Sequence, residues 1–265
     1  MSELQTDGER VIADTYQDSD QGIVIYSMHM ATYNYAIPYC LNKDVIDLGC
    51  GSGYGASYIA PHTKSITAVD ISSDAIDYAK TRYQHSQLSF QVIKANTRLP
   101  FDDNSFDTAL SFQVIEHVDN DVGYLQEAFR ILKPNGVLLL VTPDRKKRLF
   151  PLQSPWNRWH LREYSEKSLA RVASQVFKSC SSASMVAPKD IEHFENKRCA
   201  KLKWLTLPFT LPVISSKLRF RLLTYLGKFS QPGTQAPVTI KSSYHDITFS
   251  KDSSSNLNLL MVCKK

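Results

Sequence analysis

The pattern of apolar and polar positions divides most of this chain into alternating strands and helices. Short and almost unbroken apolar runs are typical of buried strands in a parallel sheet that is covered on both faces. Five such runs occupy residues 44–48, 65–70, 88–93, 106–112 and 136–142. Because amphipathic segments separate the runs, the pattern predicts an α/β fold with a Rossmann-like, doubly wound sheet.

Polar residues mark where the intervening helices begin. Serines precede the helical pattern at Ala75, Asn120 precedes the next one, and Ser165 precedes a third. Such side chains accept hydrogen bonds from the free amides of a first helical turn. A further helix is predicted before the first strand, in the stretch that ends near Pro38.

The end of the chain follows a different pattern. Residues 244–249 and 257–265 are predicted to be short strands joined by a polar turn, which favours an antiparallel hairpin. The sheet would then have seven strands and be mostly parallel. We expect four segments: an N-terminal helical cap (1–42), a cofactor-binding core (43–187), a basic lid or insertion (188–241) and the C-terminal strands (242–265).

Composition narrows the class of protein. The chain has 265 residues, of which 43% are hydrophobic and 22% charged, as in ordinary soluble globular proteins. Five scattered cysteines without a CxxC pair indicate free thiols in a reducing compartment. The N-terminus is polar, and no stretch is long and apolar enough to cross a bilayer. We therefore expect a cytoplasmic protein.

The net charge of +5 is concentrated in one region. Residues 196–241 contain many Lys and Arg but no Asp or Glu. This stretch is either a solvated face or a contact with an anionic substrate or surface. Residues 215–229 are amphipathic, so the wider segment 197–229 is a candidate for peripheral contact with the inner face of a membrane.

A glycine-rich loop, Gly49-Cys50-Gly51-Ser52-Gly53-Tyr54-Gly55, follows the first strand and precedes a helix. Such loops let a nucleotide approach the backbone, and Asp70 stands where an acid binds ribose hydroxyls. A dinucleotide fits the glycine spacing. Asp47, just before the loop, would repel a pyrophosphate and favour a cationic ligand. S-adenosylmethionine carries an ammonium, a sulfonium and a ribose, and therefore fits better.

The sequence resembles the class I S-adenosylmethionine-dependent methyltransferases. The resemblance rests on "VIDLGCGSGYGA", "AVDIS", "LPFDDNSFD", "SFQVIEHV" and "EAFRILKPNGVLLLVTP", in that order, over residues 43–178 and the final strands. The flanking stretches "GERVIADTY", "HMATYNYA" and "NRWHLREYS" resemble methyltransferases encoded in bacterial surface-polysaccharide gene clusters. That resemblance implies a sugar hydroxyl or amine as the acceptor group. The acceptor would be a small molecule or a glycan, with or without a phosphate group.

The resemblance also implies residue roles. The motif positions place a cofactor contact at Asp47, Gly49, Cys50, Gly51, Gly53, Asp70, Ile71, Ala95, Asn96, Thr97, Gln113, His29 and Tyr33. The cationic sulfonium would also be stabilised by the aromatic residues of the N-terminal cap.

For a hydroxyl acceptor, a histidine is a suitable general base. His117 and His160 both follow core strands at the open end of the sheet, and either one can have this role. Arg145, Arg162 and Glu163 are candidate substrate-binding residues beside them. Glu116 and His117 are adjacent rather than helix-spaced, so no metal site is expected.

Three other functions stay open. A quinone or other lipid would be reached through the amphipathic segment. The basic excess is also compatible with an RNA methyltransferase, although no RNA-binding module is evident and no nucleic-acid partner is expected. A non-catalytic scaffold that binds the cofactor would have the same glycine loop. The sequence does not indicate an oligomeric state.

Overall fold

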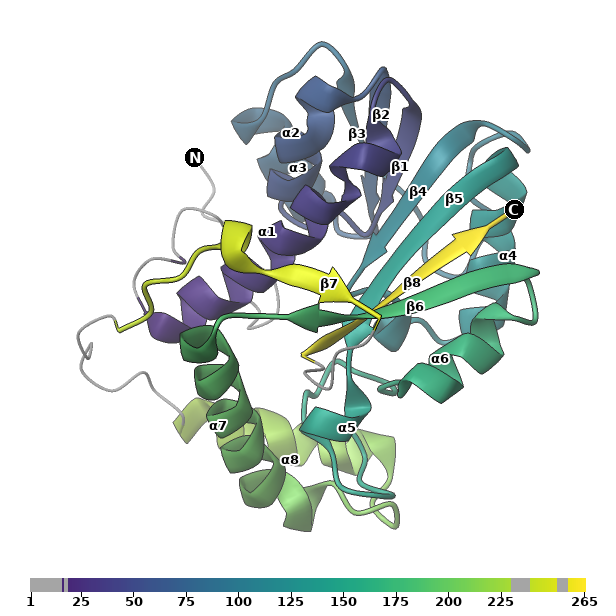
Figure 1. The fold of residues 1–265 in the computed structure, drawn as a ribbon. Helices are drawn as coiled ribbons and strands as arrows, with labels where there is room; N and C mark the ends of the chain where they lie inside the picture. The colour runs from purple at the N-terminus through teal and green to yellow at the C-terminus, as the bar shows by residue number, and fades with distance from the viewer. Residues whose placement is uncertain (1–15, 17–18, 230–238, 252–256) are drawn as a thin grey trace.

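The centre of the fold is one mixed sheet of eight strands in the order β3-β2-β1-β4-β5-β8-β6-β7 (Figure 1). The computed structural model describes residues 16, 19–229, 239–251 and 257–265. The strands are β1 (Asp44–Leu48), β2 (Ser65–Asp70), β3 (Leu88–Val92), β4 (Phe106–Phe112), β5 (Leu132–Pro143), β6 (Ser179–Val186), β7 (Thr248–Ser250) and β8 (Asn258–Lys264). The pairs among β1 to β5 are parallel, which confirms the predicted parallel core.

Helices cover both faces of this sheet. One face packs on α1 (Asp20–Cys40), α2 (Tyr54–Ile59) and α3 (Ser73–Arg82), and the other on α4 (Asp121–Ile131) and α6 (Glu166–Ala173). Neighbouring strand residues point to opposite faces: Val45 and Leu139 belong to the first core, Ile46 and Leu138 to the second. All four are buried, so the apolar runs reflect a sheet without a wet face.

The predicted caps are present. The side chain of Ser72 accepts a hydrogen bond from Ala75 N, and Asn120 Oδ1 accepts one from Gly123 N at 2.9 Å. Ser165 forms a capping box at the start of α6. Helix α1 is also confirmed, and it continues through Pro38 to Cys40. The chain before α1, including most of "GERVIADTY", lies outside the described residues.

The expected C-terminal hairpin and the count of seven strands are wrong. β6 lies between β7 and β8 and is antiparallel to both, so Met185 pairs with Phe249 and Ala183 with Leu260. β7 and β8 therefore run in the same direction on opposite sides of β6. The sequence pattern misses β6 because half of its residues, SCSSASMV, are serines. Within β6 only Ser184 and Met185 are buried.

The basic segment forms a helical layer beyond the carboxyl ends of the parallel strands (Figure 1). It comprises α7 (Lys189–Thr206), η4 (Leu207–Phe209) and α8 (Ser216–Phe229), and it faces α5 (Arg145–Arg148). Gln153 Nε2, in the loop after α5, donates to Thr210 Oγ1 at 2.8 Å. Asp20 at the start of α1 accepts from Thr239 N at 2.8 Å. The first contact joins the basic segment to the loop after α5, and the second joins the end of that segment to the N-terminal helix. The remaining short helices are η2 (Ala60–His62), η3 (Ile115–His117) and η5 (Tyr244–Asp246).

Candidate active site

The glycines of the loop after β1 serve two different purposes. Gly49, Gly51 and Gly53 have positive φ angles of 81°, 54° and 84°, which L side chains rarely adopt. A Cβ on Gly53 would lie 2.7 Å from Ala79 Cβ, so this glycine permits close packing of the loop against α3. A Cβ on Gly51 would have no described atom within 4 Å, although the residue lines a cavity. Gly51 therefore leaves room for a ligand rather than for the protein.

Asp70 fixes this loop from the end of β2. Its Oδ2 accepts a hydrogen bond from Gly51 N and its Oδ1 one from Ser72 N, both at 2.9 Å. The carboxylate also lines the cavity. Next to it, the side chain of Ile71 is 63% exposed, which is unusual for a large apolar residue. An acid beside an uncovered apolar surface suits a ribose and the base attached to it.

Asp47 lies deeper than the sequence suggests. It is buried beneath Tyr33, whose hydroxyl donates to Asp47 Oδ2 at 3.1 Å, and its Oδ1 has no hydrogen-bond partner among the described residues. Burial raises the pKa of Asp47 to about 7, opposed by the Tyr33 hydrogen bond and assisted by the charge of Asp70. A buried carboxylate with one unpartnered oxygen is costly to ionise, so a cationic ligand close to it would stabilise the ionised form.

These elements open into one cavity of about 1750 Å³ that begins at the glycine loop. The predicted cofactor residues line it with two exceptions, Asp47 and Gly53, which lie behind the wall. The lining members are His29, Tyr33, Gly49, Cys50, Gly51, Asp70, Ile71, Ala95, Asn96, Thr97 and Gln113. Gln113 has a positive φ of 59°, a strained conformation for a residue other than glycine, and strain of this kind is concentrated at functional sites.

His29 closes the cavity from α1. Its Nδ1 lies 2.8 Å from the hydroxyl of Tyr54, and burial lowers the pKa of His29 to about 4. The imidazole is therefore neutral near pH 7 and adds no positive charge beside a cationic ligand. Tyr54 lines the same wall, and the sequence pattern did not single it out.

The far end of the cavity is formed by the loop between α5 and α6 together with α7 and α8. The stretch Trp156-Asn157-Arg158-Trp159-His160 lines it together with Arg198, whose guanidinium lies over the Trp156 ring, 5.4 Å from its centroid. The guanidinium of Arg148 lies over the Trp156 ring, 4.0 Å from its centroid. Of this stretch, sequence reasoning singled out only His160. The two tryptophans so close to a histidine were the signal that it missed.

A buried chain of charged groups holds His160 in place. Glu163 Oε1 lies 3.0 Å from Arg148 Nε and 3.0 Å from His160 Nδ1. Burial opposes the ionisation of Glu163, but the Arg148 guanidinium and the His160 hydrogen bond outweigh it and hold the pKa of Glu163 below its usual range. The carboxylate is thus ionised and orients the imidazole through Nδ1.

The three predicted substrate-binding residues have partners within the protein and do not line the cavity. Arg162 donates to the carbonyls of Val118 and Asp119 at 2.6 and 2.8 Å. Arg145 donates to the carbonyl of Gln153 at 3.2 Å, and Glu163 binds Arg148 and His160 as described. A role for Arg145, Arg162 or Glu163 in direct acceptor binding stays a prediction.

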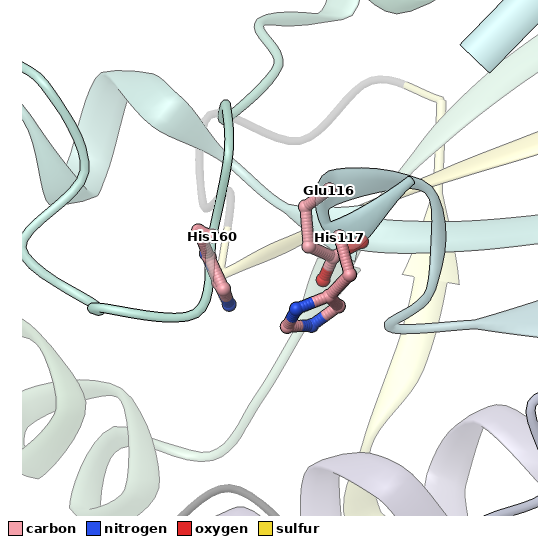
Figure 2. Close-up of side chains that lie close together, drawn as sticks. All are labelled: Glu116, His117 and His160. Atoms are coloured by element: carbon pink, nitrogen blue, oxygen red, sulfur yellow. The ribbon is translucent and has the colours of Figure 1, made fainter. Parts of the chain in front are cut away.

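The two candidate bases lie together. His117 ends η3 after β4, His160 stands on the loop before α6, and their rings meet edge to face with centroids 4.8 Å apart. Figure 2 shows them with Glu116, which comes from the same turn as His117. One ligand atom of each of the three residues lies within 4.8 Å of the others. The sequence places Glu116 and His117 side by side, but only the fold adds His160.

Comparisons with known proteins agree with this geometry. Residues 46–140 match the family model of the methyltransferase domain. A Mycobacterium tuberculosis (strain H37Rv) protein, named as a probable S-adenosylmethionine-dependent methyltransferase, is 34% identical over 167 residues. That match covers 63% of this chain and 58% of the relative, so the chain spans under two thirds of the relative's length.

Two further proteins are similar over different shares of the chain. The demethylmenaquinone methyltransferase of Tropheryma whipplei (strain Twist) is 32% identical over 133 residues, which is 50% of this chain and 53% of that protein. The crystal structure of an S-adenosylmethionine-dependent methyltransferase of Thermotoga maritima covers 95% of this chain and 100% of its own, with a TM-score of 0.54 and 17% identity. At this identity, the likeness shows the fold alone.

Residues 46–140 therefore match a methyltransferase domain, and the relative that shares this core is named as a probable S-adenosylmethionine-dependent methyltransferase. The residues present fit that cofactor, because Gly51 leaves the space and the Asp47 carboxylate, buried behind the wall, would attract a cation bound in front of it. Among the described helices, none is long and apolar enough to cross a membrane.

Proposed function

We propose that the whole protein transfers the methyl group of S-adenosylmethionine to a hydroxyl of a small-molecule or glycan acceptor, a sugar used in surface-polysaccharide synthesis. The observation that carries the proposal is the continuity of the cavity. It runs from the glycine loop at Gly51 to His117 and His160, so a cofactor and an acceptor fit end to end.

In this proposal, residues near the loop bind the cofactor. The Asp70 carboxylate accepts hydrogen bonds from the ribose hydroxyls, the exposed face of Ile71 packs on the adenine, and Asp47 pairs with the positive charge of the methionine end. Asn96 and Thr97 border the adenine edge, and Gln113 borders the methionine moiety. Tyr33 and His29 exclude water from above, since both line the cavity and His29 is neutral.

The chemistry demands little beyond alignment. The cofactor supplies an activated methyl group on its sulfonium, and positioning of two reactants can contribute about 7–11 kcal/mol to lowering a barrier. His117 and His160 are placed to act on the hydroxyl of the acceptor. Each does so either directly as a general base or through a bound ion, which is considered below.

The character of the far end favours a sugar. Trp159, 36% exposed, lines the far end and would pack an indole surface against the C–H face of a pyranose. Trp156 is stacked with the Arg148 guanidinium, so on that side the wall offers an arginine rather than an indole face. Arg148, Arg158 and Arg198 make this end positive toward hydroxyls or a phosphate. Such a mixture of an indole surface and polar groups suits a polar ring better than it suits a wholly apolar quinone tail.

A lipid or quinone acceptor is the second candidate. The T. whipplei relative is named for a quinone substrate, and α7, α8 and the turn between them expose Trp204, Leu205 and Val213, of which Val213 is 86% exposed. These apolar side chains beside the lysines of residues 197–229 would bring the protein to an anionic membrane surface.

Label transfer separates the two. The purified protein is incubated with methyl-labelled S-adenosylmethionine and a lysate of its own host, which is then fractionated into nucleotide sugars, glycans, lipids, RNA and protein. Label in the sugar or glycan fractions, lost with Gly51→Ala, is the expected result. Label in lipids or RNA instead would overturn the choice of acceptor, and no label anywhere would favour a cofactor-binding scaffold.

A further inference from the structure

Glu116, His117 and His160 form a convergent set of ligand atoms from two separate loops. One atom of each lies within 4.8 Å of the others, and Figure 2 shows the His160 imidazole next to the His117 imidazole and the Glu116 carboxylate. Ligand atoms about 2.1 Å from one ion are at most about 4.2 Å apart. Small side-chain movements would therefore close this set around a cation.

Each of the three side chains is held through its other polar atom. His160 Nδ1 lies 3.0 Å from Glu163 Oε1, and His117 Nδ1 lies 3.2 Å from the carbonyl oxygen of Trp159. Since a carboxylate and a carbonyl only accept hydrogen bonds, both Nδ1 atoms carry the proton of the neutral ring. The lone pair is then on Nε2. Metal-binding histidines have this arrangement, with the second nitrogen fixed by a carboxylate or carbonyl.

Glu116 supplies an independent sign of a ligand. Its side chain is wholly buried, and Oε2 accepts a hydrogen bond from Thr142 Oγ1 at 2.9 Å. Oε1 has no hydrogen-bond partner among the described residues. A buried carboxylate oxygen without a partner costs free energy, and a cation bound by it and the two imidazoles would remove that cost.

We propose that Glu116, His117 and His160 bind one divalent transition-metal cation, such as Zn²⁺ or Mn²⁺, at the acceptor end of the cavity. Imidazole nitrogens suit Zn²⁺ better than Mg²⁺ or Ca²⁺, the carboxylate is also a ligand that Mn²⁺ takes, and three protein ligands leave positions open for a substrate oxygen. The binding site stands on the geometry of these residues. Its role toward the acceptor rests on the proposed function.

In that role, the open position receives the acceptor hydroxyl. Coordination lowers the pKa of the hydroxyl, whose proton passes to solvent water in the cavity. The oxygen then forms a bond to the methyl carbon while the carbon–sulfur bond breaks and its electron pair stays on sulfur. The products are the methyl ether and S-adenosylhomocysteine. His117 and His160 are then ligands rather than bases.

Metal binding is tested without any acceptor. The purified protein is treated with a chelator, and Zn²⁺ and, separately, Mn²⁺ are titrated by calorimetry. One site per chain is expected for the wild type. Glu116→Gln and His117→Ala should weaken it more than tenfold, whereas His62→Ala, an exposed histidine on η2, should not. S-adenosylmethionine affinity and thermal unfolding report whether each variant is folded. If Glu116→Gln does not fold, His117→Ala, at a half-buried position, still tests the site.

The outcomes are distinct from those of the proposed function. A single site that both variants weaken supports the ion site even if no methyl transfer is found. Equal binding by wild type and the folded variants, or no binding by the wild type, overturns it. Where turnover is measurable, chelation should abolish it and Zn²⁺ or Mn²⁺ restore it while cofactor affinity stays constant. Full turnover with no bound metal would overturn the ion's role.

Discussion

The hydroxyl of Tyr33 donates a hydrogen bond to the buried Oδ2 of Asp47 at 3.1 Å, and this contact links the N-terminal helix to the end of β1. Tyr33 also meets Phe112 of β4 edge to face, with centroids 5.0 Å apart. The pair places a carboxylate of raised pKa directly beneath the wall where a cationic cofactor is expected.

This relationship predicts a pH dependence of cofactor binding. Because the pKa of Asp47 is about 7 without ligand, the ionised form that pairs with a cation becomes populated as the pH rises. S-adenosylmethionine should bind about fivefold to tenfold more weakly at pH 6 than at pH 7.5. Calorimetry at both values measures this. Asp47→Asn should bind weakly at both, and a variant with wild-type affinity would contradict the role of Asp47.

The same group makes an opposite prediction for the stability of the ligand-free protein. A carboxyl whose pKa is raised on folding holds its proton more tightly in the folded state. Its contribution to stability is therefore full below about pH 4 and is lost as the pH rises to about 7. Chemical denaturation of wild type and Asp47→Asn over this range should show the difference between them shifting in favour of the variant as the pH rises.

Gly51 and Gly53 should respond differently to alanine. Gly51→Ala meets open space, so its cost to stability is the unfavourable positive φ, about 1–2 kcal/mol. Its Cβ would enter the cavity and lower cofactor affinity more than tenfold. Gly53→Ala has the same backbone cost and also a clash with Ala79 and Phe90, so its melting temperature should fall further. Equal affinity of Gly51→Ala and wild type would contradict the placement of the cofactor.

The ion pair of Arg148 and Glu163 should matter most when half of it is removed. Both side chains are buried, so Arg148→Met leaves the Glu163 carboxylate without its guanidinium and with His160 alone, and should cost about 3 kcal/mol of the free energy of unfolding. The double variant Arg148→Met/Glu163→Leu should recover part of that loss. Urea unfolding of four proteins, the wild type, Arg148→Met, Glu163→Leu and the double variant, tests this, and additive losses would show that the two residues are not coupled.

Trp159 tests where the acceptor binds. Trp159→Ala removes an indole face from the far end of the cavity, so the KM for the acceptor should rise at least severalfold while cofactor affinity stays unchanged. Trp204→Ala is the matched control, since Trp204 is 65% exposed on α7 and does not line the cavity. If Trp204→Ala alone impairs activity, and only on membrane-bound acceptors, the lipid candidate is favoured instead.

The sequence predicts the central part of the fold because burial of these strands on both faces requires a strong hydrophobic pattern. β1, β4 and β5 are buried on both faces, so their sequences contain runs of apolar residues. Half of the residues of β6 are serines, and the strand lies next to the edge of the sheet, so the hydrophobic pattern does not predict it. The hairpin prediction failed for the same reason. Because the sequence pattern did not predict β6, the two C-terminal strands were expected to pair with each other, whereas β6 lies between them.

The site shows a similar division. Glycines and acids at strand ends have fixed positions relative to their own strand, so Gly51 and Asp70 were predictable. Arg148 was not, because nothing local indicates that the last residue of a basic run turns inward to meet Glu163 of another loop. The grouping of His160 with Glu116 also depends on the path of the loop between α5 and α6, which carries no periodic signal.

The most direct measurement of the central claim is ¹³C NMR of the product formed from ¹³C-methyl S-adenosylmethionine and the labelled fraction of the host lysate. The account predicts an O-methyl resonance on a sugar, formed together with S-adenosylhomocysteine and absent with Gly51→Ala. A methyl group on nitrogen, carbon or sulfur, or turnover of the cofactor without any methylated product, would contradict it.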